Sequence, residues 1–236
     1  MSRTFLFTGP SLHPDLARNL SNATVLPPIK RGDLERLRSL EPETIGIIDG
    51  EFYQNLAVTP KEILPFLERG VRVYGASSMG ALRAVELHRY GMIGVGRVFR
   101  LFRSGILDAD DEVALAYSPS TYEALSEPLV NTRYALRAAV RRNVLTRAEA
   151  AEAIARLKCA YFPERTRALL LSIVQEIAGK EAGARVRGFL QNGAPNVKEQ
   201  DARLLIAAIS VPSMGASRSA EACGFQASED RHLAEE

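Results

Sequence analysis

The chain has 236 residues, of which 46% are hydrophobic and 25% are charged; these values are ordinary for a globular protein with a sizeable core. The net charge is only +2, which argues against a nucleic-acid-binding protein, because such proteins usually carry a concentrated basic face. Cys159 and Cys223 are far apart and belong to no Cys/His cluster, so we expect no disulfide framework and no structural metal. The longest apolar runs are too short for a signal peptide or a membrane span. We therefore expect a cytoplasmic protein that uses no membrane, metal or cofactor.

Short apolar runs alternate with amphipathic segments through the first half of the chain. The apolar runs predict strands over residues 4–9, 23–28, 44–50 and 71–77. The amphipathic segments predict helices over residues 13–20, 32–40, 58–70 and 79–91. Strand–helix alternation of this kind indicates a parallel sheet with helices packed on it. The catalytic loops of such a sheet lie at the carboxyl ends of the strands.

The composition changes near residue 121, after which Ala, Leu, Arg and Glu dominate in helical patterns. We therefore predict an α/β fold in which an N-terminal parallel-sheet domain, residues 1–120, is followed by a C-terminal helical subdomain, residues 121–210. The remaining residues, 211–236, are rich in Ser, Ala and Glu without a sustained period. That composition is typical of a disordered terminus.

The segment GASSMGALRA, residues 75–84, predicts a strand-to-helix turn that presents Ser78 at the mouth of a site. Small neighbours, among them Ser77 and Gly80, allow a serine to sit on a sharp turn with its hydroxyl exposed. The N–H groups that follow begin a helix and point toward a developing anion, as a nucleophilic serine requires. The alternative is a structural helix N-cap, because serine is among the best capping residues.

Gly50 ends the Ile-rich run and precedes Ser78 by 28 residues, with one predicted helix between them. Locally this arrangement resembles ATP-dependent Clp protease subunits, in which a glycine turn contributes one oxyanion N–H and an ASMGA segment carries the serine. The resemblance concerns local geometry alone. It implies that Met79, together with Gly50 or Glu51, donates backbone hydrogen bonds to an oxyanion.

The histidines offer no evident base for Ser78. His88 lies ten residues further along the same predicted helix, roughly 15 Å away along its axis, and His232 is in the tail. His13 follows the first predicted strand, so it could approach the same edge of the sheet. A Ser-His-Asp triad is therefore not the arrangement that the sequence predicts.

Lys61 is the better candidate for the base, because it follows the Gly50 turn near the start of a helix and burial in a cleft lowers the pKa of a lysine. The alternative is a solvated lysine on a helix surface. Asp49 is expected to position Lys61 or a water molecule. Arg31, in a loop at the carboxyl edge, is a candidate binding residue. Arg83, on the helix after Ser78, could face the cleft or bind a partner's carboxylate.

An acidic run, residues 108–112, contains four carboxylates in five positions. Such a run could bind a hard cation. The alternative is a solvated loop or a charged helix start, and this second interpretation is the commoner one.

Several segments together resemble the TfuA-like family, in the same order and over roughly residues 5–205. They are GPSL (9–12), PPIKRGDL (27–34), IGIIDGEF (45–52), KEIL (61–64), VYGASSMGALRAVEL (73–87), GMIGVG (91–96), DDEVAL (110–115), PLVN (128–131) and KEQDA (198–202). Other family members carry a Trp-His pair before Lys-Glu-Ile-Leu, where this chain has Thr59 and Pro60. The resemblance therefore implies no histidine at that place and leaves Lys61 favoured.

The resemblance implies a partner of YcaO enzymes, which use ATP to activate a peptide backbone amide during thioamide formation. It also implies hydrolysis of a thiocarboxylate at the C-terminus of a ThiS-type sulfur-carrier protein, which releases hydrosulfide near the YcaO site. Combined with the residues above, this gives Ser78 as nucleophile, Lys61 as base, and Gly50 and Met79 as oxyanion donors.

The alternative from another class is a noncatalytic adaptor that binds the YcaO enzyme, the sulfur carrier or the precursor peptide. In that case Ser78 is a helix cap, and Arg83 and the acidic run serve recognition. Nucleotide binding at the sheet is disfavoured, because the sequence contains no GxGxxG motif and no P-loop.

Overall fold

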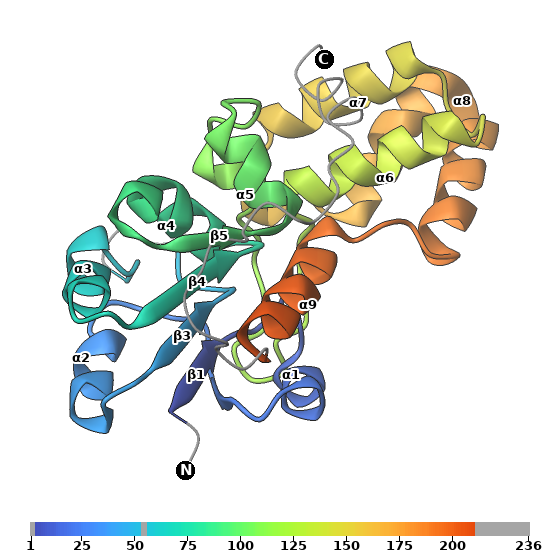
Figure 1. Cartoon of the computed structure of the whole chain (residues 1–236). Coiled ribbons are helices and arrows are strands. Elements are labelled where there is room, and N and C mark those ends of the chain that lie inside the picture. Colours follow the sequence, from blue (N-terminus) through green and yellow to red (C-terminus); the bar gives the residue numbers. More distant parts are fainter. Residues whose placement is uncertain (1–2, 53–55, 211–236) are drawn as a thin grey trace.

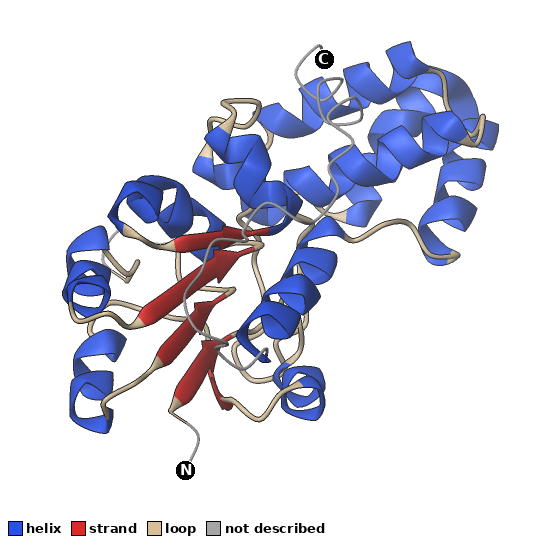
Figure 2. Cartoon of the chain, viewed as in Figure 1, coloured by secondary structure: helices blue, strands red, loops and turns tan. Residues whose placement is uncertain are grey.

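The structure is a computed structural model that describes residues 3–52 and 56–210. At its centre is a sheet of five parallel strands in the order β2-β1-β3-β4-β5, drawn in red in Figure 2. The strands are β1 (Thr4–Phe7), β2 (Thr24–Leu26), β3 (Thr44–Ile47), β4 (Arg72–Ala76) and β5 (Ile93–Val95). The predicted parallel sheet is confirmed. Strand β5, only three residues long, was not predicted.

The helices of the sheet region follow the strands in alternation; the first four were predicted, and the fifth was not. They are α1 (Pro14–Leu20), α2 (Asp33–Leu37), α3 (Pro60–Glu68), α4 (Met79–Leu87) and α5 (Gly96–Arg103). The C-terminal helices are α6 (Leu129–Arg141), α7 (Arg147–Cys159), α8 (Arg167–Gln191) and α9 (Val197–Ser210). Short 3-10 turns are η1 (Arg38–Leu40), η2 (His88–Tyr90), η3 (Asp110–Glu112) and η4 (Phe162–Glu164). In the part of the chain that the structure describes, no helix has the length and apolarity to cross a membrane.

Helices cover both faces of the sheet (Figure 1). On one face, residues of α2, α3, α4 and α5 share a buried cluster with Phe7 and Ile47 of the sheet. On the other face, Leu205 of α9 and Ala17 of α1 share a second cluster with Leu6. Burial on both faces explains why the strands read as nearly continuous apolar runs.

Helices α6, α7 and α8 form a core of their own, in which Leu136, Ile154 and Val174 are buried. They lie beside the sheet region, at the upper right of Figure 1. Helix α9 also lies within the predicted helical subdomain 121–210, but its apolar side packs on the sheet. The chain therefore leaves the sheet for three helices and then returns to it. The predicted tail, residues 211–236, lies outside the described residues.

The turn from β4 to α4 brings backbone segments into very close contact. A Cβ atom added to Gly80 would lie 1.8 Å from the carbonyl oxygen of Ile47, and one added to Gly75 would lie 2.1 Å from the carbonyl oxygen of Gly80. Only glycine allows such an approach. Helix α4 therefore begins directly against strands β3 and β4, which fixes the position of Ser78.

We predict that Gly80→Ala destabilises the fold by about 3 kcal/mol or more, because the added methyl group meets backbone atoms that cannot rotate away. Gly188→Ala on α8 is the matched control, since a Cβ atom there meets nothing within 4 Å. That change should stabilise the protein by up to about 1 kcal/mol. Urea denaturation measures both free energies of unfolding, and equal effects of the two substitutions would contradict the packing account.

Candidate active site

A cleft of about 180 Å³ opens at the carboxyl edge of the sheet, where the sequence placed the catalytic loops. Loops after β1, β2, β3 and β4 all contribute to it, as do the segment before α6 and the starts of η4 and α9. Its lining residues are Pro10, Pro28, Asp49, Gly50, Glu51, Phe52, Ser78, Leu115, Ala116, Tyr117, Pro119, Phe162 and Lys198. The cleft lies where the strand order reverses: β2 follows β1 on one side of the sheet, whereas β4 and β5 follow β3 on the other. Loops that leave the strands at such a switch point diverge and leave room for a ligand.

Ser78 lies on the sharp turn that the sequence predicts, but the predicted exposure of its hydroxyl is wrong, because the residue is only 2% exposed and lies at the inner end of the cleft. Ser77 takes a left-handed φ of 67°, and the N–H of Ser78 donates to the carbonyl oxygen of Ala76 at 2.7 Å, as in a γ-turn. Ser78 occupies the N-cap position of α4, yet its hydroxyl makes no capping hydrogen bond within the described residues. The hydroxyl instead contacts a lysine amine. A purely structural helix cap therefore does not describe this serine.

That lysine is Lys198, on the first turn of α9. Its Nζ donates to the hydroxyl of Ser78 at 3.1 Å and to the carbonyl oxygen of Val113 at 2.7 Å, and the residue is only 1% exposed. Burial lowers the pKa of Lys198 to about 8, although the negative charges of Asp49 and Glu127 oppose the shift. A share of the molecules therefore carries a neutral amine near neutral pH. A neutral amine can accept the proton of Ser78 and still donate to Val113.

Two backbone N–H groups near Ser78 are candidates for an oxyanion site. Among the hydrogen bonds of residues 3–52 and 56–210, none is donated by the N–H of Gly50 or of Met79. The N–H of Glu51, in contrast, donates to the carbonyl oxygen of Ile29 at 3.0 Å. A Cβ atom on Gly50 would lie 2.8 Å from Cγ of Met79, so these two residues are in direct contact. Of the alternatives in the sequence prediction, Gly50 rather than Glu51 keeps its N–H available.

Asp49 is buried and organises the loop that follows β1. One carboxylate oxygen accepts from the N–H groups of Gly9 and Ser11, both at 2.9 Å, and the other accepts from the hydroxyl of Ser11 at 2.6 Å. These three bonds fix the position of the carboxylate. Asp49 therefore lines the cleft as a fixed negative charge that acts on Lys198 through space.

One wall of the cleft is aromatic and held by a hydrogen bond. The hydroxyl of Tyr117 donates to Glu51 at 2.7 Å, and its ring stacks on that of Tyr122. Burial and the Glu51 carboxylate raise the pKa of Tyr117 well above its ordinary value, so the phenol stays protonated. The wall is therefore uncharged at Tyr117 and fixed in place.

The structure places Lys61 and Arg31 together, but away from Ser78. Both line a second cavity, between α2 and α3, which they share with Glu62. The Glu62 carboxylate caps the start of α3 and accepts from the N–H of Gly32 at 2.7 Å. The base role of Lys61 stays a prediction of the sequence, whereas the lysine in contact with Ser78 is Lys198.

The other predicted site residues have structural contacts of their own. Arg83 pairs with Glu86 one turn further along α4, and Gly80 packs against strand β3. Nδ1 of His13 accepts from a backbone N–H at the start of α1, and Nδ1 of His88 contacts the carbonyl oxygen of Val85. His232 and Cys223 lie outside the described residues. Of the site residues that the sequence predicted, the structure therefore brings Asp49, Gly50 and Ser78 together at the cleft.

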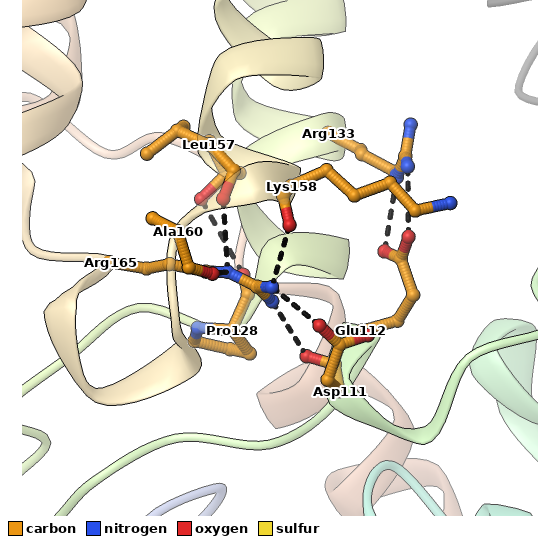
Figure 3. A network of polar contacts seen from close by, with 9 residues as sticks. Asp111, Glu112, Pro128, Arg133, Leu157, Lys158, Ala160 and Arg165 are labelled. Carbon is orange, nitrogen blue, oxygen red and sulfur yellow. Dashed lines mark hydrogen bonds and ion pairs between the residues drawn. The ribbon is translucent and has the colours of Figure 1, made fainter.

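Two carboxylates of the acidic run, residues 108–112, make ion pairs with arginines of the C-terminal part (Figure 3). Glu112 is 1% exposed and accepts two hydrogen bonds from Arg133 of α6, at 3.0 and 2.8 Å. Asp111 pairs with Arg165, which also donates to backbone carbonyls at the end of α7. Among the described residues, no three or more His, Cys, Asp or Glu side chains lie together in a way that could hold a metal ion. The run fixes η3, directly before Val113, to the helical part.

Lys198 was not among the predicted site residues, although two features of the sequence indicated it. Lysine is rare in this chain, and Lys198 lies in the KEQDA segment. It also lies in line with Ala202, Leu205 and Ile209, the apolar side of α9, where a charged residue is unusual. Asp201 interrupts the same apolar side. What the sequence could not supply was the fold that brings residue 198 back to residue 78.

Together, the fold and the site define an α/β protein with a buried serine–lysine pair in a cleft at the carboxyl ends of its strands. A family model described as TfuA-like protein matches residues 49–166. That is half of the chain, and the chain belongs to the TfuA-like family. The match begins at Asp49 and includes Ser78, whereas Lys198 lies beyond it. No curated protein matches this chain.

We predict that the Lys198 amine titrates near pH 8 in the folded protein. Lysine side-chain carbon and nitrogen NMR signals, followed from pH 6 to 11, measure this directly, and the signal is assigned by its loss in Lys198→Met. The chain has only five lysines, Lys30, Lys61, Lys158, Lys180 and Lys198, so the spectrum is simple. A pKa of Lys198 near its ordinary value of about 10.4 would contradict the burial that the structure shows.

Proposed function

We propose that this TfuA-like protein hydrolyses the C-terminal thiocarboxylate of a ThiS-type sulfur-carrier protein and releases hydrosulfide. The observation that carries the proposal is the contact between the buried Lys198 amine and the Ser78 hydroxyl, 3.1 Å apart, inside an open cleft. A serine within hydrogen-bond reach of a partly neutral amine is an activated nucleophile. Family membership supports the carrier as the substrate.

The first half-reaction transfers the acyl group to the protein. Oγ of Ser78 attacks the carbonyl carbon of the thiocarboxylate while its proton passes to Nζ of Lys198. The tetrahedral intermediate then collapses with cleavage of the C–S bond, and Lys198 returns the proton to the departing sulfur. The products are an ester between Ser78 and the carrier C-terminus, and hydrosulfide.

The second half-reaction restores the serine. A water molecule gives a proton to Lys198 and attacks the ester carbonyl carbon, and Ser78 leaves with that proton. The new carboxylic acid then ionises, and its proton is taken up by the hydrosulfide or by water. With hydrosulfide as the acceptor the sum is thiocarboxylate plus water to carboxylate plus hydrogen sulfide, which balances in atoms and charge. No oxidant, reductant or nucleotide is required.

The oxyanion of both tetrahedral intermediates is assigned to the N–H groups of Gly50 and Met79. Met79 begins α4, and the N–H groups at a helix start favour a negative charge. Removal of one such donor from known acyl-transfer enzymes slows them by about 100- to 1,000-fold. The protonated Lys198 adds a positive charge beside the same centre.

In this proposal the cleft receives the extended C-terminal tail of the carrier. Pro10, Pro28 and Pro119 line it together with Tyr117 and Phe162, so its walls are rigid and largely apolar. A tail that ends in small residues can reach Ser78, which is itself only 2% exposed. In this proposal the protein works in the cytoplasm beside a YcaO enzyme, which consumes the hydrosulfide to form a thioamide in a precursor peptide.

We predict that Ser78→Ala and Lys198→Met each reduce hydrosulfide release from purified thiocarboxylated carrier by at least about 1,000-fold. Ser172→Ala, on the exposed side of α8, is the control and should leave the rate unchanged. Intact-mass spectrometry of the carrier follows the conversion of thiocarboxylate to carboxylate. If the wild-type protein leaves the carrier mass unchanged without a YcaO enzyme, the protein is an adaptor and not a hydrolase.

The rate should also depend on pH with a defined sign. Because the neutral form of Lys198 accepts the proton of Ser78, the rate per enzyme should rise with pH and level off above the pKa of about 8. A rate that falls as the pH rises from 7 to 9, at saturating carrier, would rule out Lys198 as the base.

A further inference from the structure

We propose that Asp201 is the positioning residue of the Ser78–Lys198 pair. Its carboxylate, bound at the start of α5, fixes the first turn of α9 and thereby holds Nζ of Lys198 against Ser78. The expected effect on turnover rests on the proposed function. The position and burial of the Lys198 amine can be measured without the reaction.

Asp201 is buried and makes two hydrogen bonds to another helix. Its carboxylate oxygens accept from the N–H groups of Arg97, at 2.9 Å, and Val98, at 2.7 Å, and the residue is 1% exposed. Burial raises the pKa of Asp201 to about 6, while these two N–H groups and the charges of Arg100 and Arg97 favour the ionised form. At neutral pH the carboxylate is therefore largely ionised and accepts both bonds.

Gly96 makes room for this carboxylate. Its φ is 92°, and a Cβ atom on it would lie 2.2 Å from Cγ of Asp201. Both the left-handed backbone and the close approach require glycine. The start of α5 is thus shaped to receive a side chain from a helix that comes about one hundred residues later in the chain.

The same turn of α9 is held from a second side by α6. Oδ1 of Asn131 accepts from the N–H of Lys198 at 3.1 Å, and Nδ2 of Asn131 donates to Oδ1 of Asn196 at 2.9 Å. The backbone of Lys198 is therefore fixed between α6 and the Asp201 contact with α5. Residues three apart on a helix lie on one side of it, so Asp201 and Lys198 both point toward the sheet region.

Loss of the Asp201 contact should shift the pKa of Lys198 in the opposite direction from a loss of the Asp201 charge alone. If the first turn of α9 moves, water reaches the Lys198 amine and its pKa rises toward the ordinary value. Removal of a negative charge without movement would shift that pKa downward. The direction of the shift therefore separates positioning from electrostatics.

The test compares Asp201→Ala, Asp201→Asn and Gly96→Ala with Glu199→Gln as control. Gly96→Ala keeps the carboxylate but fills the space it occupies. Asp201→Asn keeps the shape but loses one of the two acceptor oxygens. Glu199 lies on the same turn and pairs with Arg203 near the surface, so its replacement leaves the anchor intact. Circular dichroism and thermal unfolding identify the variants that remain folded.

In folded Asp201→Ala and Gly96→Ala, NMR titration should show the Lys198 pKa raised by about one unit or more, with a smaller rise in Asp201→Asn and no change in Glu199→Gln. Turnover of thiocarboxylated carrier should fall about tenfold or more in kcat with little change in KM, as expected for a misplaced catalytic group. A Lys198 pKa that stays constant or falls in these variants would overturn the inference. If the wild-type protein shows no turnover, the proposed function fails, while the titration still decides whether Asp201 positions Lys198.

Discussion

A buried lysine amine, that of Lys198, is the interaction on which the rest of the site depends. Taking a lysine out of water costs several kcal/mol unless the charged form is compensated. Here the compensation is partial, because the Ser78 hydroxyl and the Val113 carbonyl accept hydrogen bonds and Asp49 supplies a negative charge. The result is an amine that changes protonation state near neutral pH. This makes the pair suited to proton transfer rather than to a permanent ion pair.

The architecture around this amine explains why separate segments of the chain carry unusual residues. Gly96 ends the GMIGVG segment, Asn131 ends PLVN, and Lys198 and Asp201 belong to KEQDA. All of them meet at the first turn of α9. The DDEVAL segment supplies the carbonyl of Val113, and its Glu112 is held by Arg133. Segments that contain no reactive side chain therefore all contribute contacts that hold Lys198 in place.

Much of the sheet region was predictable because its signals are local. Apolar runs that alternate with amphipathic segments gave four of the five strands, and the small residues around Ser78 gave the sharp turn. Gly50 was found at the right edge of the sheet because the carboxyl ends of parallel strands meet there. These features depend on residues that are close in the sequence, and the structure contains them at the predicted positions.

The partner of Ser78 was not predictable in the same way. Lys61 is close to Gly50 in sequence, but Glu62 caps the start of α3 and the helix faces a different cavity. Lys198 is 120 residues from Ser78, and only the return of α9 to the sheet brings the two together. A charged residue on the apolar side of that helix was the available signal. Its meaning depends on the tertiary fold, which periodicity does not supply.

The most direct measurement is a search for the covalent intermediate on Ser78. Thiocarboxylated carrier is mixed with the protein, quenched in acid at intervals from milliseconds to seconds, and analysed by intact mass and by mapping of the peptide that contains residues 75–84. The account predicts an ester-linked carrier on Ser78 that forms with hydrosulfide release, decays with a rise in free carboxylate, and is absent in Ser78→Ala. Conversion of the carrier at the full rate by Ser78→Ala, with no adduct on the wild-type serine at any interval, would contradict it.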